Sequence, residues 1–375
     1  MIIGFDASRI VSDGAGRGSY ARTLINDISA VVPAGVNLNL YAPDRGKDIL
    51  RQQIKPHSNL RFVYPDNCIC TLQKELWRMK GVVNDLRRDG VNIFHGLSGT
   101  LPAGLKKAGI RSVVTIHDII FMRHPEYYSL SERMFLGWQF RRTCREADRI
   151  IAISECTKRD ITLFGNVEPE RIDVIYQSCG TRFKLRESEK KLQEVHTRYM
   201  LPHRYVVSVG TIEERKNILL AVKAIRLLPA DISLVVVGRP TAYAAKVRQF
   251  INENGLQERV HILGDVPYDD LPAIYQMAEV SVYPSGYEGF GIPVIEAIQS
   301  GLPVVACTGS CLEESGGNDT IYVSPDDSYG MAEAIKSVLK GTPGREERIE
   351  RSLQYITRFE GNNVARQVID VYNKL

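Results

Sequence analysis

The sequence predicts an α/β protein made of two tandem doubly wound, Rossmann-like domains that face a cleft. Short apolar segments of strand type alternate with helical segments along both halves, which is typical of parallel sheets covered by helices on both faces. The chain has 375 residues, more than one hydrophobic core usually serves, so two domains are expected. Such sheets bind ligands at the carboxyl ends of their strands, and the cleft is therefore the predicted site.

In the first half, the alternating pattern predicts strands at 1–6, 37–42, 60–64, 92–95, 111–117 and 149–154. Helices are expected from about 14 to 31 and over 72–88, 131–147 and 155–164. Ser154 stands directly before the last of these helices and is predicted to be its N-cap. A polar stretch from Glu187 then interrupts the pattern. We place the domain boundary there, with a first domain at 1–185 and a second domain at 186–359.

In the second half, strands are predicted at 205–210, 233–238, 260–263, 280–283, 303–307 and 320–323. Helices are expected to start near residues 216, 242, 268, 292 and 329. A final helix over about 345–375 has a weak point at Gly361-Asn-Asn, so its end, about 360–375, is expected to cross back onto the first domain.

Composition indicates an ordinary globular protein, with 44% hydrophobic and 25% charged residues. No apolar run reaches 18 residues, and residues 1–6 have the pattern of a strand with no signal peptide before them. Of seven cysteines, only Cys68/Cys70 and Cys307/Cys311 lie close together, which is no zinc pattern. We therefore expect reduced thiols and a cytoplasmic location.

The net charge of +4 is uneven, because basic residues exceed acidic ones only in the first half. A basic first half would favour contact with acidic lipid head groups or an acidic acceptor. Ordinary surface variation explains the uneven charge equally well. The amphipathic segments 74–88 and 133–149, with Trp77 and Trp138 among arginines, favour coverage of the sheet over contact with the inner membrane at its cytosolic face. Nothing resembles the basic stripe of a nucleic-acid-binding protein.

The most informative stretch is 283–303, where a strand, a glycine-rich turn and a helix follow one another. Pro293 stands where a helix begins, and Gly301 and Pro303 end it. A helix N-terminus after such a turn favours anions. Glu288 on the turn and Glu296 in the helix suit a ligand with hydroxyl groups on either side of a diphosphate. A plain strand–turn–helix unit with exposed glutamates is the alternative.

Arg215 and Lys216 follow the first strand of the second half, just before a helix. The helix dipole disfavours cations there, so an anionic ligand is the better reason for them. In the first half, His117 ends a strand and is predicted to donate to a hydroxyl or carbonyl group of a ligand. The segment Gly14-Ala-Gly-Arg-Gly18 follows the first strand, where it favours close approach to a phosphate or sugar and an ordinary tight turn equally.

Several of these segments together resemble the family 4 retaining glycosyltransferases of the GT-B fold. The segment Glu288-Gly-Phe-Gly-Ile-Pro-Val-Ile-Glu296 resembles their E-x7-E motif, and Gly210 to Asn217 resembles their phosphate-binding segment. Residues 14–18, 115–127 and 154–160 also match recurrent segments of the family. The likeness spans nearly the whole chain.

The resemblance implies a catalytic set and a donor-binding set, with a nucleotide sugar held mainly by the second domain. In the catalytic set, Arg215 and Lys216 stabilise the departing diphosphate, while Glu288 and His117 contact the donor sugar. In the donor-binding set, Glu296 holds the ribose. The other predicted donor-binding residues are Gly16, Arg17, Gly18, Gly238, Val266, Gly289, Phe290, Gly291 and Ile292.

The family needs no metal ion, and no Asp-x-Asp motif occurs here, so we expect neither a metal nor another cofactor. The mechanism implied is front-face attack, in which the leaving phosphate oxygen deprotonates the acceptor hydroxyl. Many relatives carry Pro-Asn-Gly-Val after the strand that ends the first domain. Here Val174-Ile-Tyr-Gln-Ser-Cys-Gly180 replaces it, which leaves the role of that loop open.

The stretch Arg123-His-Pro-Glu-Tyr127 resembles mannosyl-transferring members of bacterial surface-polysaccharide synthesis. GDP-mannose is therefore the favoured donor, UDP-sugars stay open, and the expected acceptor is a glycan or a lipid-linked glycan of polysaccharide or lipopolysaccharide synthesis. Two other functions remain: a sugar-nucleotide epimerase of the same fold, and a non-catalytic GT-B protein that binds sugar nucleotides. The intact set of charged residues disfavours the second.

Overall fold

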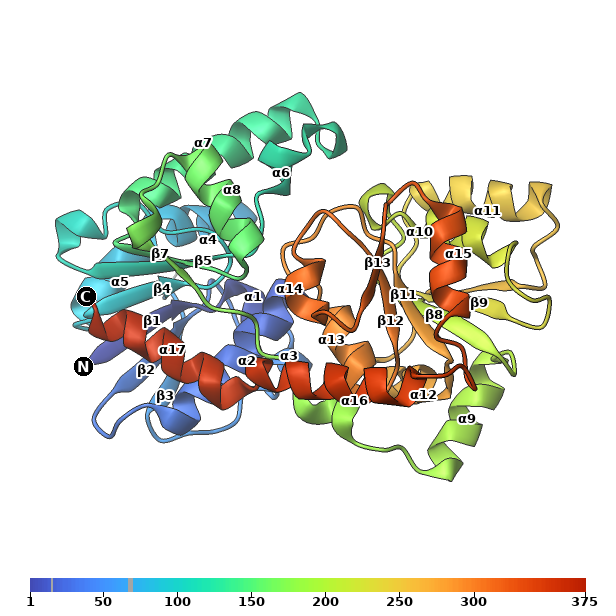
Figure 1. Cartoon of the computed structure of the whole chain (residues 1–375). Coiled ribbons are helices and arrows are strands. Elements are labelled where there is room, and N and C mark those ends of the chain that lie inside the picture. Colours follow the sequence, from blue (N-terminus) through green and yellow to red (C-terminus); the bar gives the residue numbers. More distant parts are fainter. Residues whose placement is uncertain (15, 67–69) are drawn as a thin grey trace. The chain divides into compact units, whose positions relative to one another are not determined.

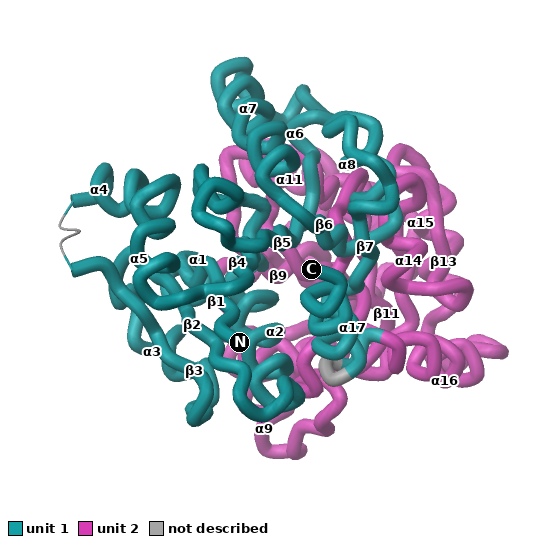
Figure 2. Tube along the Cα trace, turned by 90° about the vertical axis from the view of Figure 1, so that its left-hand side faces the viewer, with its two compact units in different colours: residues 1–178, 359–375 teal, residues 179–358 magenta. Residues whose placement is uncertain are grey.

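The computed structural model describes residues 1–14, 16–66 and 70–375, so Ala15 of the first glycine-rich turn and Cys68 lie outside the described residues. The chain forms two compact units, residues 1–178 with 359–375 and residues 179–358 (Figure 2). The α/β class and the two doubly wound sheets agree with the sequence analysis. The six cysteines within the described ranges are free thiols.

The first unit is built on a parallel sheet of seven strands in the order β3-β2-β1-β4-β5-β6-β7. The order in which successive strands are added reverses between β1 and β4, where Phe5 pairs with His95. This position is a topological switch point. The strands are β1 (Ile2–Asp6), β2 (Asn37–Tyr41), β3 (Leu60–Val63), β4 (Ile93–Gly96), β5 (Arg111–Ile116), β6 (Arg149–Ala152) and β7 (Ile172–Val174).

Helices cover both faces of this sheet because its strands are apolar on both sides (Figure 1). One face packs on α1, α2 and α17, and the other on α5, α7 and α8. The helices are α1 (Ser8–Ser12), α2 (Gly16–Val31), α3 (Asp48–Arg51), α4 (Thr71–Leu76), α5 (Val82–Arg88), α6 (Ile120–Arg123), α7 (Leu130–Glu146), α8 (Glu155–Gly165) and α17 (Gly361–Asn373). Short turns are η1 (Trp77–Gly81), η2 (Lys106–Ala108), η3 (Pro125–Tyr127) and η4 (Pro169–Arg171).

The second unit repeats this topology with a parallel sheet of six strands in the order β10-β9-β8-β11-β12-β13. Its switch point lies between β8 and β11, where Val206 pairs with Val280. The strands are β8 (Tyr205–Val209), β9 (Ser233–Val237), β10 (Val260–Leu263), β11 (Val280–Tyr283), β12 (Val304–Cys307) and β13 (Ile321–Val323).

The helices of the second unit are α9 (Glu189–Tyr199), α10 (Ile218–Ile225), α11 (Tyr243–Glu253), α12 (Leu271–Met277), α13 (Ile292–Gln299), α14 (Leu312–Gly316), α15 (Ser328–Lys336) and α16 (Arg345–Ile356). Helix α9 precedes β8, helices α10 to α14 lie between successive strands, and α15 and α16 follow β13. The short turns are η5 (Thr181–Lys184), η6 (Glu214–Lys216) and η7 (Tyr268–Asp270), and η8 (Thr357–Phe359) leads to α17.

The division between the units follows Ser178, whereas the sequence analysis placed it after residue 185. The reason is that the turn η5 packs with the second unit. The ring of its residue Phe183 lies 5.5 Å from Tyr268 and 5.7 Å from Tyr275, and it is almost fully buried. The polar stretch that begins at Glu187 therefore lies after the division between the units and does not mark it.

Three helices differ from the predicted ones. The expected helix over 72–88 is interrupted by the π-helical turn η1, and the expected break in the last helix lies at η8, just before Gly361. The helix expected near residue 216 begins at Ile218, because Asn217 adopts a left-handed conformation with φ of 51°. Ser154 caps α8 as predicted and accepts from the Thr157 N–H at 3.0 Å.

Within the described ranges, every helix is too short or too polar to cross a lipid bilayer.

Candidate active site

Two loops meet at the switch point of the second unit, one after β8 and one after β11. The Gly286 N–H ties them together by donating to the Arg215 carbonyl at 3.0 Å, and the Ser285 hydroxyl oxygen lies 3.3 Å from the same carbonyl. Arg215 and Lys216 lie in the turn η6 between β8 and α10. This geometry brings the predicted cations beside the predicted acidic turn.

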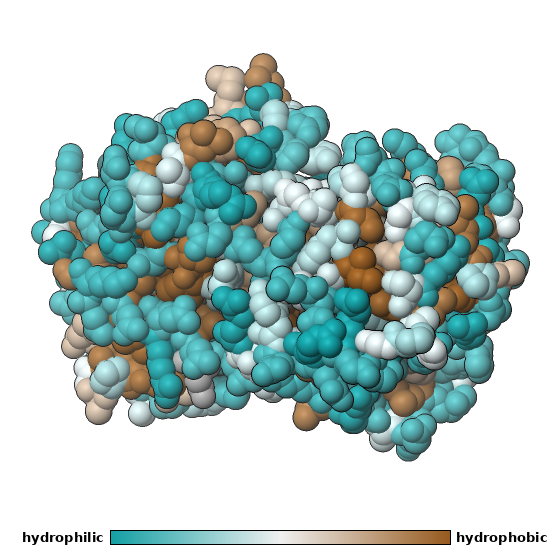
Figure 3. Space-filling view, in the orientation of Figure 1, coloured by the Kyte–Doolittle hydropathy of each residue, from teal (hydrophilic) through white to brown (hydrophobic). Residues whose placement is uncertain are grey.

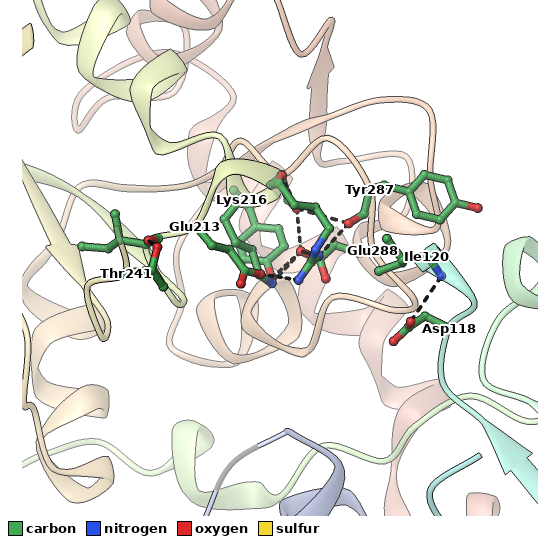
Figure 4. Close-up of polar contacts among 11 residues, drawn as sticks. Asp118, Ile120, Glu213, Lys216, Thr241, Tyr287 and Glu288 are labelled. Carbon is green, nitrogen blue, oxygen red and sulfur yellow. Dashed lines mark hydrogen bonds and ion pairs between the residues drawn. The ribbon is translucent and has the colours of Figure 1, made fainter. Parts of the chain in front are cut away.

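The Glu288 carboxylate is the centre of this site, and Lys216 points toward it (Figure 4). Its Oε1 atom accepts from Lys216 Nζ at 2.5 Å and lies 3.0 Å from Arg215 Nη1. The same atom accepts from the hydroxyl groups of Ser285 at 2.5 Å and Tyr283 at 3.3 Å. The Glu288 carboxylate thus holds both cations at one point, and Ser285 and Tyr283 also donate to it.

Arg215 is held from two further sides. It donates to the Tyr287 carbonyl at 2.8 Å and to the Glu213 carboxylate at 2.6 Å (Figure 4). Lys216 also donates to the Tyr283 hydroxyl at 2.7 Å. The two cations are therefore preorganised, which reduces the entropy lost when an anion binds.

The electrostatics of the cluster favour its charged form. Burial alone would raise the pKa of Glu288, but Lys216 and then Arg215 lower it to about 2. Burial would lower the pKa of Arg215, and the charges of Glu288 and Glu213 raise it instead. The carboxylate and the guanidinium are thus both ionised at neutral pH.

Helix α13 begins directly after this loop, and Gly291 is the residue that allows it. Its φ is +104°, and a Cβ atom there would lie 2.6 Å from Leu312 Cδ2. Pro293 occupies the first turn, as predicted. Gly289 and Phe290 of the loop are buried, and Ile292 is the first residue of the helix.

Glu296 lies one turn into α13 and is 8% exposed. Burial raises its pKa to about 7, with no other cause. None of the described residues donates a hydrogen bond to its carboxylate. A buried carboxylate without a partner is costly, so it is a candidate for hydrogen bonds from a ligand.

The remaining predicted residues of this unit lie at strand ends. Gly238 follows β9, and its N–H donates to the Leu263 carbonyl at 2.9 Å. Val266 is half-buried in the loop after β10. A small cavity at the end of β8 is lined by Gly210, Thr211 and Lys216, next to the carboxylate cluster.

In the first unit, His117 follows β5 and uses both of its ring nitrogens within the protein. Nε2 lies 2.9 Å from the Leu97 carbonyl, which only accepts, so Nε2 carries the proton. Nδ1 then accepts from the Gln177 amide at 2.8 Å. Burial lowers the pKa of His117 to about 4, and Arg17 acts in the same direction, so the ring is neutral. For His117 to contact a donor sugar, it must lose its hydrogen bond with either Leu97 or Gln177. This contact stays a prediction.

The first glycine-rich turn forms the start of α2. Gly16 has φ of +49° and opens the helix, and Arg17 beside it is exposed. Gly18 is needed for packing, because a Cβ atom there would lie 2.1 Å from the Asp13 carbonyl oxygen. The close approach that explains Gly18 is therefore to the chain's own backbone, and its role toward a donor stays a prediction.

Some functional neighbours were not recognised in the sequence. Tyr283 and Ser285 bind Glu288, and Glu213 binds Arg215. All three lie within five residues of a predicted site residue, so proximity to the motif was their only signal. Gln177 has no such signal, because it is sixty residues from His117 in the chain.

Comparisons with known proteins identify the class. A family model described as "Glycosyltransferase Family 4" matches residues 16–179, and one described as "Glycosyl transferases group 1" matches residues 196–354. These matches fall one on each unit. The chain belongs to the family 4 glycosyltransferases of the GT-B fold, and the protein is a hexosyltransferase.

Among its relatives is O-antigen chain mannosyltransferase B of Escherichia coli, 29% identical over 287 residues, which are 76% of this chain and 74% of the relative. O-antigen chain mannosyltransferase RfbU of Salmonella typhimurium is 28% identical over 257 residues, covering 68% of this chain and 67% of the relative. Both of these relatives are named as mannosyltransferases of O-antigen chains.

Two solved structures show the same fold over the full chain. Anabaena Alr3699/HepE, solved in complex with UDP and glucose, has a TM-score of 0.76 at 19% identity and covers 100% of this chain and 99% of its own. Sucrose-phosphate synthase from Thermosynechococcus elongatus has a TM-score of 0.77 at 20% identity and covers 100% and 98%.

Proposed function

We propose that the protein is a retaining glycosyltransferase that moves a hexosyl group, mannose by preference, from a nucleoside-diphosphate sugar to a glycan or lipid-linked glycan. The observation that carries this proposal is the charge arrangement of the second unit. Two fixed cations lie beside the loop before α13, and that helix carries a buried carboxylate, Glu296, which has no partner among the described residues. A diphosphate suits the cations, and the ribose hydroxyls suit the carboxylate.

The donor residues have the following roles in this proposal. Arg215 and Lys216 balance the charge that develops on the leaving diphosphate, and the N-terminus of α13 adds its dipole. Glu296 accepts hydrogen bonds from the ribose. Glu288 and His117 contact the hexose. Glu288 has a second role, because it also holds the two cations in position. Gly16 and Arg17 approach the phosphate from the first unit.

The reaction we propose occurs on one face of the sugar. The bond between C1 and the diphosphate oxygen breaks, and the acceptor oxygen bonds to C1 from the same side. The hydroxyl proton passes to the departing phosphate oxygen, so no enzyme carboxylate acts as a nucleophile. The configuration at C1 is retained. No divalent ion takes part, because Arg215 and Lys216 supply the positive charge.

The choice of mannose has support from relatives. The names of two relatives specify mannosyl transfer, and GDP-mannose is the matching donor in our proposal. A neighbour by fold was solved with UDP and glucose, so UDP-sugars are the competing donors. The proposed setting is the cytoplasm, with peripheral contact at the inner face of the membrane where a lipid-linked acceptor lies.

A panel of sugar nucleotides tests the proposal directly. We expect GDP-mannose to raise the melting temperature and to release GDP slowly by hydrolysis, with UDP-sugars giving smaller effects. The anomer of any transferred mannose, read by NMR, is expected to match that of the donor. Excess EDTA is expected to leave the rate unchanged.

Three outcomes would contradict parts of this proposal. Stabilisation by UDP but not GDP would reassign the donor, and loss of activity in EDTA would restore a metal to the mechanism. Conversion of a sugar nucleotide to its epimer without an acceptor would identify an epimerase instead.

A further inference from the structure

A second charged cavity lies at the switch point of the first unit. Its volume is about 320 Å³, and Asp6 at the end of β1 and Ser98 beyond β4 line it. In the second unit the matching position holds Lys216 and Glu288. The two units thus place ionic groups at the same topological position, but the donor accounts only for those of the second unit and for Arg17.

The cavity carries more positive than negative charge. Its wall contains two acidic and four basic side chains, which are Asp6, Glu75, Arg9, Arg17, Arg78 and Arg142. Arg78 Nε lies 3.5 Å from Asp6 Oδ2, and its Nη1 lies 3.4 Å from Glu75. Both acids are therefore engaged with one arginine, and the excess positive charge favours an anion.

Several polar atoms in this wall lack hydrogen-bond partners. Ser98 is 5% exposed, and its hydroxyl has none among the described residues. The Nε atom of Arg142 is also buried without a hydrogen bond in the described part of the chain, whereas that of Arg78 has only its ion pair with Asp6. Burial lowers the pKa of Arg142, and the charge of Glu146 offsets this only in part. A bound anion would satisfy these groups.

The other part of the wall is apolar. Trp77, Leu101 and Phe135 line it, and Trp77 and Arg78 come from the π-helical turn η1. Such turns in helices frequently mark functional sites. The cavity therefore combines arginine forks with an apolar surface, which suits an amphiphilic anion rather than a free sugar.

The apolar surface continues from the cavity to the outside along α7. Phe135 lines the cavity and is 54% exposed. Leu130, Met134 and Trp138 of the same helix are also exposed, and hydrophobic atoms reach the surface over this region at the top of Figure 3. Arg142 lies 5.1 Å from the Trp138 ring and connects this surface with the charged wall.

We propose that this cavity binds the phosphate-bearing end of a lipid-linked acceptor. The arginines bind the phosphate oxygens, the Ser98 hydroxyl donates to them, and the apolar chain follows Phe135 and the exposed side of α7. This inference rests on the proposed function, because it names the acceptor class of the same transfer reaction.

Three small probes separate the parts of this proposal. Calorimetric titration of the full-length protein uses farnesyl diphosphate, farnesol and inorganic pyrophosphate, with the donor site filled by saturating GDP or UDP. Farnesyl diphosphate carries both the anion and the chain, so we expect it to bind at least about tenfold tighter than either partial probe. Equal binding of farnesol would overturn the role of the arginines, and equal binding of pyrophosphate would overturn the role of the apolar wall.

Matched variants locate the binding. Arg142→Met is expected to weaken farnesyl diphosphate binding by about tenfold or more, since a hydrogen-bonded charge is removed. Arg141→Met, next to it on α7 but outside the cavity wall, is the control and is expected to bind normally. Ser98→Ala removes only the hydroxyl and is expected to weaken binding several-fold, which keeps the test valid if Arg142→Met does not fold.

The donor site supplies the final comparison. Lys216→Ala is expected to weaken nucleotide binding and leave farnesyl diphosphate binding unchanged, and Arg142→Met is expected to do the reverse. If the wild-type protein binds nucleotide but not farnesyl diphosphate, this inference is wrong and the proposed function stands. If it binds no nucleotide, the proposed function is wrong, and the farnesyl diphosphate titration still decides the cavity.

Discussion

At the scale of single residues, Glu288 explains how two cations can be held at one point before any ligand binds. Its carboxylate contacts Lys216 Nζ and Arg215 Nη1 and keeps both in place. Removal of one member of such a buried cluster leaves the others poorly compensated, which makes the cluster sensitive to substitution.

Lys216→Ala is expected to lower turnover by about a hundredfold, which corresponds to about 3 kcal/mol, the usual effect of one charge contact made in the transition state. Initial-rate measurements of product formation check this. Lys223→Ala, on the exposed side of α10, is the matched control and is expected to be neutral. Turnover like that of the wild type would remove Lys216 from the chemistry.

Glu296 makes stability depend on pH in the opposite sense to an ordinary paired carboxylate. Its pKa rises from 4.5 in the unfolded chain to about 7 in the folded protein because it is buried. The folded state therefore binds more protons between these values, and the free energy of unfolding falls as the pH rises from 4.5 to 7. The full penalty, at most about 3 kcal/mol, is present above pH 7.

Glu296→Gln removes this penalty and is expected to raise the free energy of unfolding at pH 8 by up to about 3 kcal/mol, with little change at pH 4.5. Urea unfolding at the two pH values measures it. The same variant is expected to bind nucleotide more weakly, because a carboxylate accepts from ribose more strongly than an amide. A loss of stability at pH 8 would show that the protein itself satisfies this carboxylate.

At the scale of elements, the loop after β11 depends on backbone that only glycine provides. Gly291 combines a φ of +104° with a contact of 2.6 Å between a built Cβ atom and Leu312 Cδ2. The start of α13, and with it the position of Glu296, therefore depends on close packing against α14.

Two glycine substitutions separate strain from packing. Gly309→Ala has a similar φ of +96° with no atom within 4 Å of the new Cβ, so it is expected to cost about 1–2 kcal/mol through backbone strain alone. Gly291→Ala is expected to cost about 1–3 kcal/mol more, because it also overpacks the contact with Leu312. Chemical denaturation gives both values, and equal costs would contradict the packing argument.

Helix α17 shows how an element joins a unit far from it in sequence. Val368 and Tyr372 are buried in the core of the first unit, and the Tyr372 hydroxyl lies 2.6 Å from His95 Nδ1. His95 Nε2 also lies 2.8 Å from the Thr115 hydroxyl, so this histidine is a structural residue. The last seventeen residues of the chain therefore complete a core that begins with β1.

At the scale of the whole molecule, the two units have different dependence on the C-terminus. A chain that ends at Arg358 lacks α17 and is expected to lose the cooperative folding of the first unit, since buried apolar surface becomes exposed. Residues 179–358 contain their own sheet and core and are expected to fold alone. Hydrogen exchange of the shortened chain and of residues 179–358 measures the folding of each unit. Strong protection of β1 in the shortened chain would contradict the role of α17.

Much of the fold follows from local patterns in the sequence. Strand ends such as those of β10 and β11 were predicted to the residue, because apolar runs there are bounded by glycine or proline. Ser154 was recognised as a cap from its neighbours alone. The π-helical interruption at Trp77–Gly81 was not predicted, whereas the break before α17 was expected close to its observed place, from the sequence Gly361-Asn-Asn.

The sequence alone determined the alternation of strands and helices, the candidate cations Arg215 and Lys216, and the two glutamates beside the helix start. These are signals of order and spacing within short segments. Only the tertiary structure decided that Glu288 binds both cations, that Glu296 has no hydrogen-bond donor among the described residues, and that the Gln177 amide donates to His117 Nδ1. The physical reason is that hydrogen bonds and ion pairs require particular distances between residues far apart in the chain, and sequence spacing does not specify these distances.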